Sequence, residues 1–136
     1  MDDWTDGESC ISWEELKQKV NVIETDQTFE EGSTDGEKIW VSNKYGDERK
    51  ICILLHEIAH KKLHFGENRS KLTKQEKELE AETVSFMCSK VLGVTNEQAG
   101  AYITNYYKEN PAGEISNRAS KLVRCSEEIL NELGVI

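Results

Sequence analysis

Several residue types and patterns are scarce in this chain of 136 residues, and each scarcity excludes a class of protein. No apolar run approaches the length of a membrane span, so we expect no transmembrane helix. The four cysteines lie far apart and form no C-x-x-C pair, which excludes a zinc ribbon and a thioredoxin-type redox site. The first residues are acidic rather than basic and apolar, so no secretion signal is predicted and the expected location is the cytoplasm.

Basic residues are scarce in the first quarter of the chain. Residues 1–37 hold 12 of the 26 acidic residues but only 2 of the 17 basic ones, and the remainder is close to neutral. A nucleic-acid-binding protein needs a basic face, so that function is not expected. We predict an acidic, mobile N-terminus over residues 1–12 and a single domain over residues 13–136. The alternative for the acidic quarter is a surface that docks a basic partner.

Periodicity and capping signals predict a mainly helical α+β domain with a small twisted sheet. Helices are expected at about 13–21, 74–92 and 114–133. The motif helix is expected to follow Asp47 as its N-cap and to end at Phe65-Gly66, and a further helix is expected to begin at Thr95 to Gln98 and to end at residues 110–113. A strand is predicted at 38–42, a second one within 22–29, and a turn or loop over 30–37. The strand at 38–42 enters the second helix through a tight turn. It is therefore expected at the sheet edge, where an extended peptide could add by backbone pairing.

Histidine is also scarce, because the chain has only three and all of them lie between positions 56 and 64. His56 and His60 form an H-E-x-x-H pattern around Glu57, in a segment without glycine or proline. Residues i and i+4 share one helix face, so both imidazoles can bind one Zn²⁺ while Glu57 lies beside it as general base. Unpartnered imidazoles are costly to bury in an apolar helix, which favours a metal site over two surface histidines. Other divalent ions suit the same ligands.

The third ligand is expected to be a carboxylate. A catalytic zinc usually has three protein ligands and an open position, and no histidine lies outside the motif helix. Glu80, on the following helix, shares a face with apolar residues, so a metal would provide the partner that a buried acid needs. We predict His56, His60 and Glu80 as the metal ligands, with Glu76 and Glu82 as alternatives. The other interpretation of these glutamates is a solvated acidic face.

Other polar residues near the motif have less defined roles. Glu78 is assigned to a more polar face of its helix and is not predicted as a ligand. Three histidines at i, i+4 and i+8 do not easily bind one ion, so His64 is expected to end the helix or to support a ligand. Tyr45, His64 and Tyr102 are candidates for the donor that stabilises an oxyanion.

Two segments resemble a known group of metallopeptidases. Residues 54–60 (LLHEIAH) and 78–86 (ELEAETVSF) are similar to zincin-like enzymes of the ImmA/IrrE type, most of all to the metalloprotease domain of ArdC-like antirestriction proteins. The likeness extends over about residues 38–133. It implies a compact zincin fold, the ligands His56, His60 and Glu80, and Glu57 as general base.

The resemblance also indicates a function. ImmA-like members cleave repressor-type regulators, so we expect zinc-dependent hydrolysis of a peptide bond in a protein substrate such as a regulator. ArdC-like members carry a separate domain that binds single-stranded DNA, and this chain departs from that layout because its N-terminal part is short and acidic. Two rival interpretations stay open. One is a non-proteolytic metal-binding module that docks a basic partner through the acidic quarter, and the other is a structural metal site with a fourth protein ligand.

Overall fold

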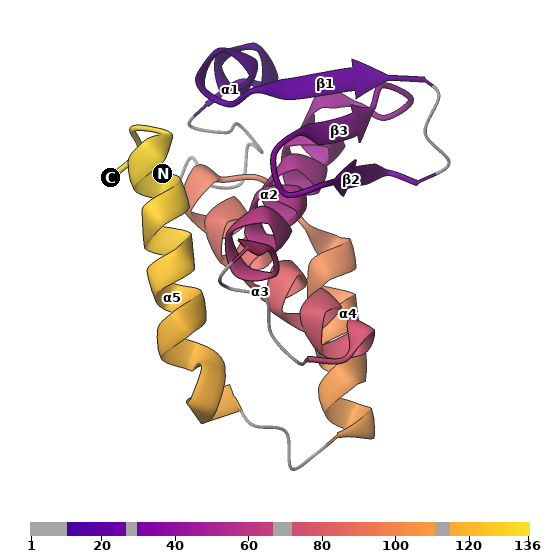
Figure 1. Cartoon of the computed structure of the whole chain (residues 1–136), viewed down its shortest axis with the longest axis vertical. Coiled ribbons are helices and arrows are strands. Elements are labelled where there is room, and N and C mark those ends of the chain that lie inside the picture. The colour runs from indigo at the N-terminus through magenta and orange to yellow at the C-terminus, as the bar shows by residue number, and fades with distance from the viewer. Residues whose placement is uncertain (1–10, 27–29, 67–71, 111–114) are drawn as a thin grey trace, which may run out of the picture.

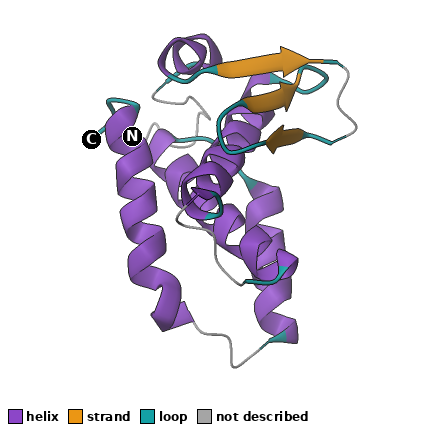
Figure 2. Ribbon diagram, in the orientation of Figure 1, coloured by secondary structure: helices purple, strands orange, loops and turns teal. Residues whose placement is uncertain are grey.

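The computed structural model describes residues 11–26, 30–66, 72–110 and 115–136, so most of the predicted mobile N-terminus lies outside the described residues. The described residues form five helices and three strands: α1 (Trp13–Lys19), β1 (Val22–Thr25), β2 (Gly32–Thr34), β3 (Ile39–Ser42), α2 (Asp47–Leu63), α3 (Lys74–Leu92), α4 (Glu97–Glu109) and α5 (Ile115–Glu132). The predicted mainly helical α+β class is confirmed (Figure 1, Figure 2). None of the described helices is long and apolar enough to cross a membrane.

The sheet has the strand order β1-β3-β2, with β1 parallel and β2 antiparallel to β3. The strand predicted at the sheet edge, residues 38–42, is therefore central, and that prediction is wrong. The edge strands are β1 and β2, and β2 lies in the polar segment expected to be a turn or loop. Its three residues, Gly-Ser-Thr, have no apolar alternation, so the sequence carries no local strand signal there.

Helix α2 is the buried centre of the fold and carries the H-E-x-x-H motif. It packs against α1, α3, α5, β2 and β3, and it crosses the molecule with the sheet on one side and α3 on the other (Figure 1). The run from Ile51 to Leu55 is buried throughout, because neighbours surround this part of the helix. Asp47, predicted as the N-cap, is instead the first helical residue, and the N-cap Gly46 makes no side-chain capping bond. Packing rather than capping therefore holds the start of α2.

Helix α3 has a well-defined start and end, as the sequence predicts. Thr73 and Glu76 form a reciprocal capping box, with side-chain to backbone distances of 3.1 and 3.0 Å. At the other end, Gly93 takes the left-handed conformation (φ 76°) that favours glycine. Because α3 also packs against α2, α4 and α5, its rotation about its own axis is set, and so is the direction of each of its glutamates.

The carboxylate of Glu24 joins α1, β1 and α2. It accepts hydrogen bonds from the indole of Trp13 at 3.0 Å and from the ammonium groups of Lys17 at 2.8 Å and Lys50 at 2.9 Å. Burial alone would raise the pKa of Glu24, but these donors outweigh it and lower the pKa to about 2. We call this group the Glu24 cluster. Its single carboxylate is surrounded by donors, so it links the sheet to both helices.

Candidate metal centre

His56 and His60 lie one turn apart on α2, and their rings converge. The two Nε2 atoms are 3.1 Å apart, and both side chains are mostly buried, with 16% and 14% exposure. The i, i+4 spacing produces this convergence within a single helix, as the sequence predicts.

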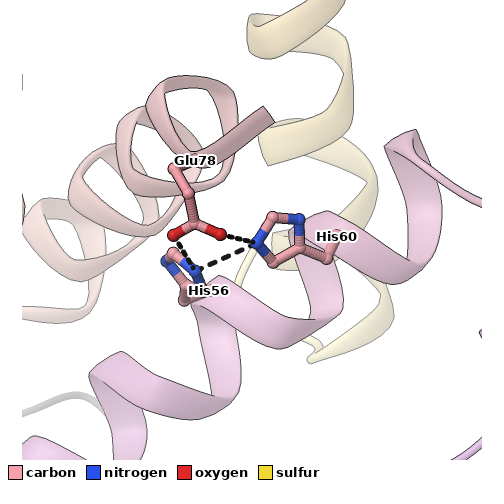
Figure 3. Close-up of side chains that lie close together, drawn as sticks. All are labelled: His56, His60 and Glu78. Atoms are coloured by element: carbon pink, nitrogen blue, oxygen red, sulfur yellow. Dashed lines mark hydrogen bonds and ion pairs between the residues drawn. The ribbon is translucent and has the colours of Figure 1, made fainter. Parts of the chain in front are cut away.

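The third member of the cluster is Glu78, which reaches across from α3 (Figure 3). One carboxylate oxygen lies 2.9 Å from Nε2 of His60, and the other lies 3.3 Å from Nε2 of His56. Among the described residues, this group of one carboxylate and two imidazoles is the arrangement with the spacing of a metal site. We call His56, His60 and Glu78 the metal cluster.

The donor atoms of the metal cluster lie close enough together to be compared with the ligands of a tetrahedral zinc. Ligand bonds of 2.0–2.1 Å place neighbouring donors of a tetrahedral ion about 3.3 Å apart. The two Nε2 atoms are 3.1 Å apart, and each lies at a similar distance, 2.9 or 3.3 Å, from a different oxygen of Glu78. A zinc ion held by these three residues would have a fourth position for water or substrate, as catalytic zinc sites do.

Hydrogen bonds to the Nδ1 atoms of His56 and His60 determine the tautomer and the orientation of each imidazole ring. Nδ1 of His56 lies 2.7 Å from a carboxylate oxygen of Glu82, and Nδ1 of His60 lies 2.8 Å from Nδ1 of His64. A carboxylate can only accept, so Nδ1 of His56 carries the hydrogen and, in the neutral ring, Nε2 keeps its lone pair. The same holds for His60 when it donates to His64. Three acceptor atoms then face one another, which is unfavourable unless a cation lies between them.

The pKa shifts in the metal cluster also favour a bound cation. Burial alone would lower the pKa of His56, but hydrogen bonds to Glu78 and Glu82 outweigh it and raise the pKa to about 10. The hydrogen bonds from His56 and His60 lower the pKa of Glu78 well below its usual range. The two carboxylates therefore create a negative potential at the two Nε2 atoms, which favours a bound cation there, whether proton or metal.

Glu57 lies next to the metal cluster and is only 8% exposed. Burial raises the pKa of its carboxyl, and the nearby imidazoles of His56 and His60 reduce that shift. A carboxylate with a raised pKa beside a metal is suited to exchanging protons with water. Glu57 lines the same hollow as His60, and its role as general base stays a prediction.

Two hollows meet at the metal cluster and together form a groove. One has a volume of about 660 Å³ and continues past His60 toward Phe65 and Lys77. The other, of about 380 Å³, continues past His56 toward Arg49 and Gln98. Both hollows are lined by residues from the sheet side, from α2 and from α3, namely Glu30, Gly32, Glu57, Lys74 and Glu78. The open side of the metal cluster is therefore accessible to an extended molecule.

Glu80, the predicted third ligand, is not brought to the two histidines. Helical periodicity correctly places it in the interior, where it is 1% exposed. Its carboxylate lies 3.0 Å from Nε2 of His64 and accepts from Lys121 at 2.8 Å and Arg118 at 3.3 Å. Burial alone would raise the pKa of Glu80, but hydrogen bonds from His64 and Lys121 outweigh it and lower the pKa. Glu80 thus has the partners that a buried acid needs, but these partners are the side chains of His64, Lys121 and Arg118 and not the predicted metal.

The two alternative ligands, Glu76 and Glu82, are also absent from the group of donors around the Nε2 atoms of His56 and His60. Glu76 bonds to its own cap, Thr73, and to Arg118, while Glu82 bonds to Nδ1 of His56. Glu78 was missed because it lies on the more polar face of α3, and its side chain is 35% exposed. A position at the border between the buried and the polar face of α3 is the sequence signal that could have identified Glu78. A metal with an open position must lie where the interior meets the solvent, so its ligand belongs at the border of the buried face.

Among the described candidates for an oxyanion donor, only His64 contacts the metal cluster, and it does so behind His60. Tyr45 is 40% exposed after β3, and the ring nitrogens of His64 are engaged by His60 and Glu80. The hydroxyl of Tyr102 donates to the backbone carbonyl of Gln75 at 3.3 Å. Burial and the negative charge of Glu78 raise the pKa of Tyr102.

Comparison with family models, with curated proteins and with solved structures gives no match for this chain. The resemblance to zincin-like metallopeptidases therefore stays a prediction, and the geometry of the metal cluster carries the functional conclusion.

Proposed function

We propose that the protein is a zinc-dependent metallopeptidase that hydrolyses a peptide bond in an extended polypeptide, such as a segment of a regulatory protein. The observation that carries this proposal is the metal cluster, in which two imidazoles and one carboxylate meet at contacts of 2.9 to 3.3 Å beside a groove lined by Glu57.

The chemistry divides between the metal and the carboxylate beside it. When bound, Zn²⁺ supplies Lewis acidity, which makes water acidic near neutral pH and polarises a carbonyl. Glu57 accepts a proton from the attacking water as the new carbon–oxygen bond forms. It then gives that proton to the amine as the carbon–nitrogen bond breaks. His56, His60 and Glu78 hold their positions throughout and keep the reacting groups within reach of Glu57.

Strand β2 provides a backbone edge along which a polypeptide can lie. Glu31 and Asp35 make backbone hydrogen bonds to the β3 side. Alternate residues of an antiparallel strand bond to opposite sides, so Gly32 and Thr34 direct their N–H and C=O groups to the outer edge. Within the described ranges no further strand pairs with that edge. A substrate that adds here as a strand would pass the metal cluster, because β2 lines the same hollow as His60.

Gly32 allows β2 to come close to the motif helix. A Cβ at this position would lie 2.5 Å from Cγ2 of Ile53 and 3.2 Å from Cγ of Glu57. No side chain fits there without movement of the strand or the helix. The close approach therefore places the backbone edge of β2 directly beside the carboxylate that handles the proton.

The proposal is tested with zinc-loaded protein and a library of fluorescence-quenched peptides. We expect the parent protein to cleave some of them, and Glu57→Gln to reduce the rate by about 10²- to 10⁴-fold, the usual contribution of a general base, with zinc content unchanged. Glu14→Gln, at a 74% exposed position on α1, is the matched control and should cleave at the parent rate. Equal cleavage by Glu57→Gln and the parent would show that the mechanism is wrong. Stoichiometric zinc with no cleavage of any peptide would favour the non-proteolytic binding module.

A further inference from the structure

A chain of polar contacts leads from His60 away from the groove and into the interior. Nδ1 of His60 lies 2.8 Å from Nδ1 of His64, and Nε2 of His64 lies 3.0 Å from Oε1 of Glu80. The other oxygen of Glu80 accepts from Lys121 at 2.8 Å and from Arg118 at 3.3 Å. The middle of this chain is the most enclosed polar contact of the site, since the side chains of His64 and Glu80 are 2% and 1% exposed.

The donor and the acceptor of each hydrogen bond along this chain of contacts can be assigned by starting from Lys121 and Arg118. Lys121 and Arg118 are donors only, so Glu80 is an ionised acceptor and the hydrogen of a neutral His64 must be on Nε2. Nδ1 of His64 is then an acceptor, and it must receive its hydrogen from Nδ1 of His60. This leaves Nε2 of His60 with a free lone pair that points into the metal cluster.

A purely structural explanation does not account for this arrangement. A buried carboxylate and imidazole are expensive to desolvate, and apolar side chains of similar size would fill the same space between α2, α3 and α5 at lower cost. The pair instead lies directly behind a predicted metal ligand, with every hydrogen in the position that ligand needs.

We propose that His64 and Glu80 are positioning residues, which hold His60 in the tautomer and orientation that bind the metal, with Arg118 and Lys121 of α5 balancing the charge of Glu80. This rests on the metal site in the proposed function but not on peptide hydrolysis. His56 has a shorter arrangement, a direct bond to Glu82 with both side chains partly exposed (16% and 18%). The two ligands of α2 are thus oriented by separate partners, and α5 takes part in only one of them.

The test compares Glu80→Gln with Glu76→Gln. Both residues lie on α3 and bond to Arg118, but only Glu80 contacts His64. Glutamine retains the capping box at position 76, so that variant is a matched control. Zn²⁺ affinity is measured by competition with a chromophoric chelator. We expect Glu80→Gln to bind Zn²⁺ about 10- to 100-fold more weakly, the usual cost of removing a partner of a ligand. Glu76→Gln should bind as the parent does.

A second measurement needs no variant. Long-range ¹H–¹⁵N spectra of the zinc-loaded parent protein report which nitrogen of each imidazole carries hydrogen. We expect His60 to carry it on Nδ1 and His64 on Nε2, and in Glu80→Gln the signals of His60 should shift while those of His56 do not. The proposal is overturned if His64 carries hydrogen on Nδ1, or if Glu80→Gln retains the parent affinity and spectrum.

The two proposals can fail separately. Zinc binding by the parent with no peptide cleavage removes the proposed hydrolysis and leaves the positioning test intact. A parent protein that does not bind Zn²⁺ overturns both proposals.

Discussion

Two polar clusters join the elements of this protein, and they differ in their balance of donors and acceptors. In the Glu24 cluster one carboxylate receives hydrogen bonds from an indole and two ammonium groups, so its charge is satisfied by the protein itself. In the metal cluster a carboxylate and two ring nitrogens converge within 3.3 Å, and every one of them is an acceptor when the rings are neutral.

This difference separates a stabilising cluster from a binding cluster. The donors around Glu24 lower its pKa, so the folded state gains free energy from the ionised carboxylate. The metal cluster has the opposite property, because Glu78 and the neighbouring Glu82 raise the pKa of His56 and so favour an added cation. Removing an acidic residue from one cluster should reduce stability, and removing one from the other should reduce cation binding.

The largest expected effect comes from removing the negative charge of the metal cluster. Glu78→Gln takes away both an expected zinc ligand and a charge that attracts the cation. We expect Zn²⁺ affinity to fall by more than about 100-fold, beyond the range for losing an outer partner of a ligand. Chelator competition measures this, with Glu24→Gln as the control that should retain the parent affinity. If the two variants bind Zn²⁺ equally well, the contrast between the clusters is wrong.

Acidity should weaken the same site through His56. Its pKa is raised to about 10, so below that pH the ring is mostly protonated in the free protein, and Zn²⁺ must displace the proton. Affinity should therefore rise with pH, by about tenfold per unit between pH 6 and pH 8 from this group alone. Calorimetry in buffers of different ionisation enthalpy should detect about one released proton per ion at pH 7. An affinity that does not change over this range would contradict the expectation.

The smallest expected effect is on stability, through the Glu24 cluster. The pKa of Glu24 is lowered from 4.5 to about 2, so its contribution is fully present above pH 4.5 and is lost as the pH falls toward 2. Glu24→Gln should reduce the free energy of unfolding at pH 7 by up to about 3 kcal/mol, and the variant should lose less stability than the parent on acidification. Urea unfolding at pH 7 and pH 3 measures both quantities. A pH dependence equal to that of the parent would show that the cluster does not stabilise the fold.

Sequence reasoning succeeded where geometry is local. His56 and His60 lie in one helix, so their spacing alone brings the two rings together. The capping box of Thr73 and Glu76 likewise depends on four consecutive residues and is present as predicted. The helices and the fold class follow from the same short-range signals.

Sequence reasoning failed where contacts between segments distant in the chain determine the structure. Periodicity ranks the glutamates of α3 by depth, and it correctly placed Glu80 inside, but depth does not say which neighbour a buried acid meets. That depends on how α3 is rotated against α2 and α5, which brings Glu80 to His64 and Glu78 to the metal cluster. Strand β2 was missed for the same reason, because its pairing with β3 rather than its own three residues makes it a strand.

The absent side chain of Gly32 offers a practical means of changing substrate choice. The space between β2 and the motif helix is limited by Cγ2 of Ile53 and Cγ of Glu57, and none of the three ligand side chains limits it. Alanine at position 32 combined with leucine at position 53, which has no Cγ2, would exchange one methyl group for another across this contact. If the proposed peptidase activity is found, position 32 is therefore the place to begin engineering it for bulkier or slimmer polypeptides, with the three proposed zinc ligands left untouched.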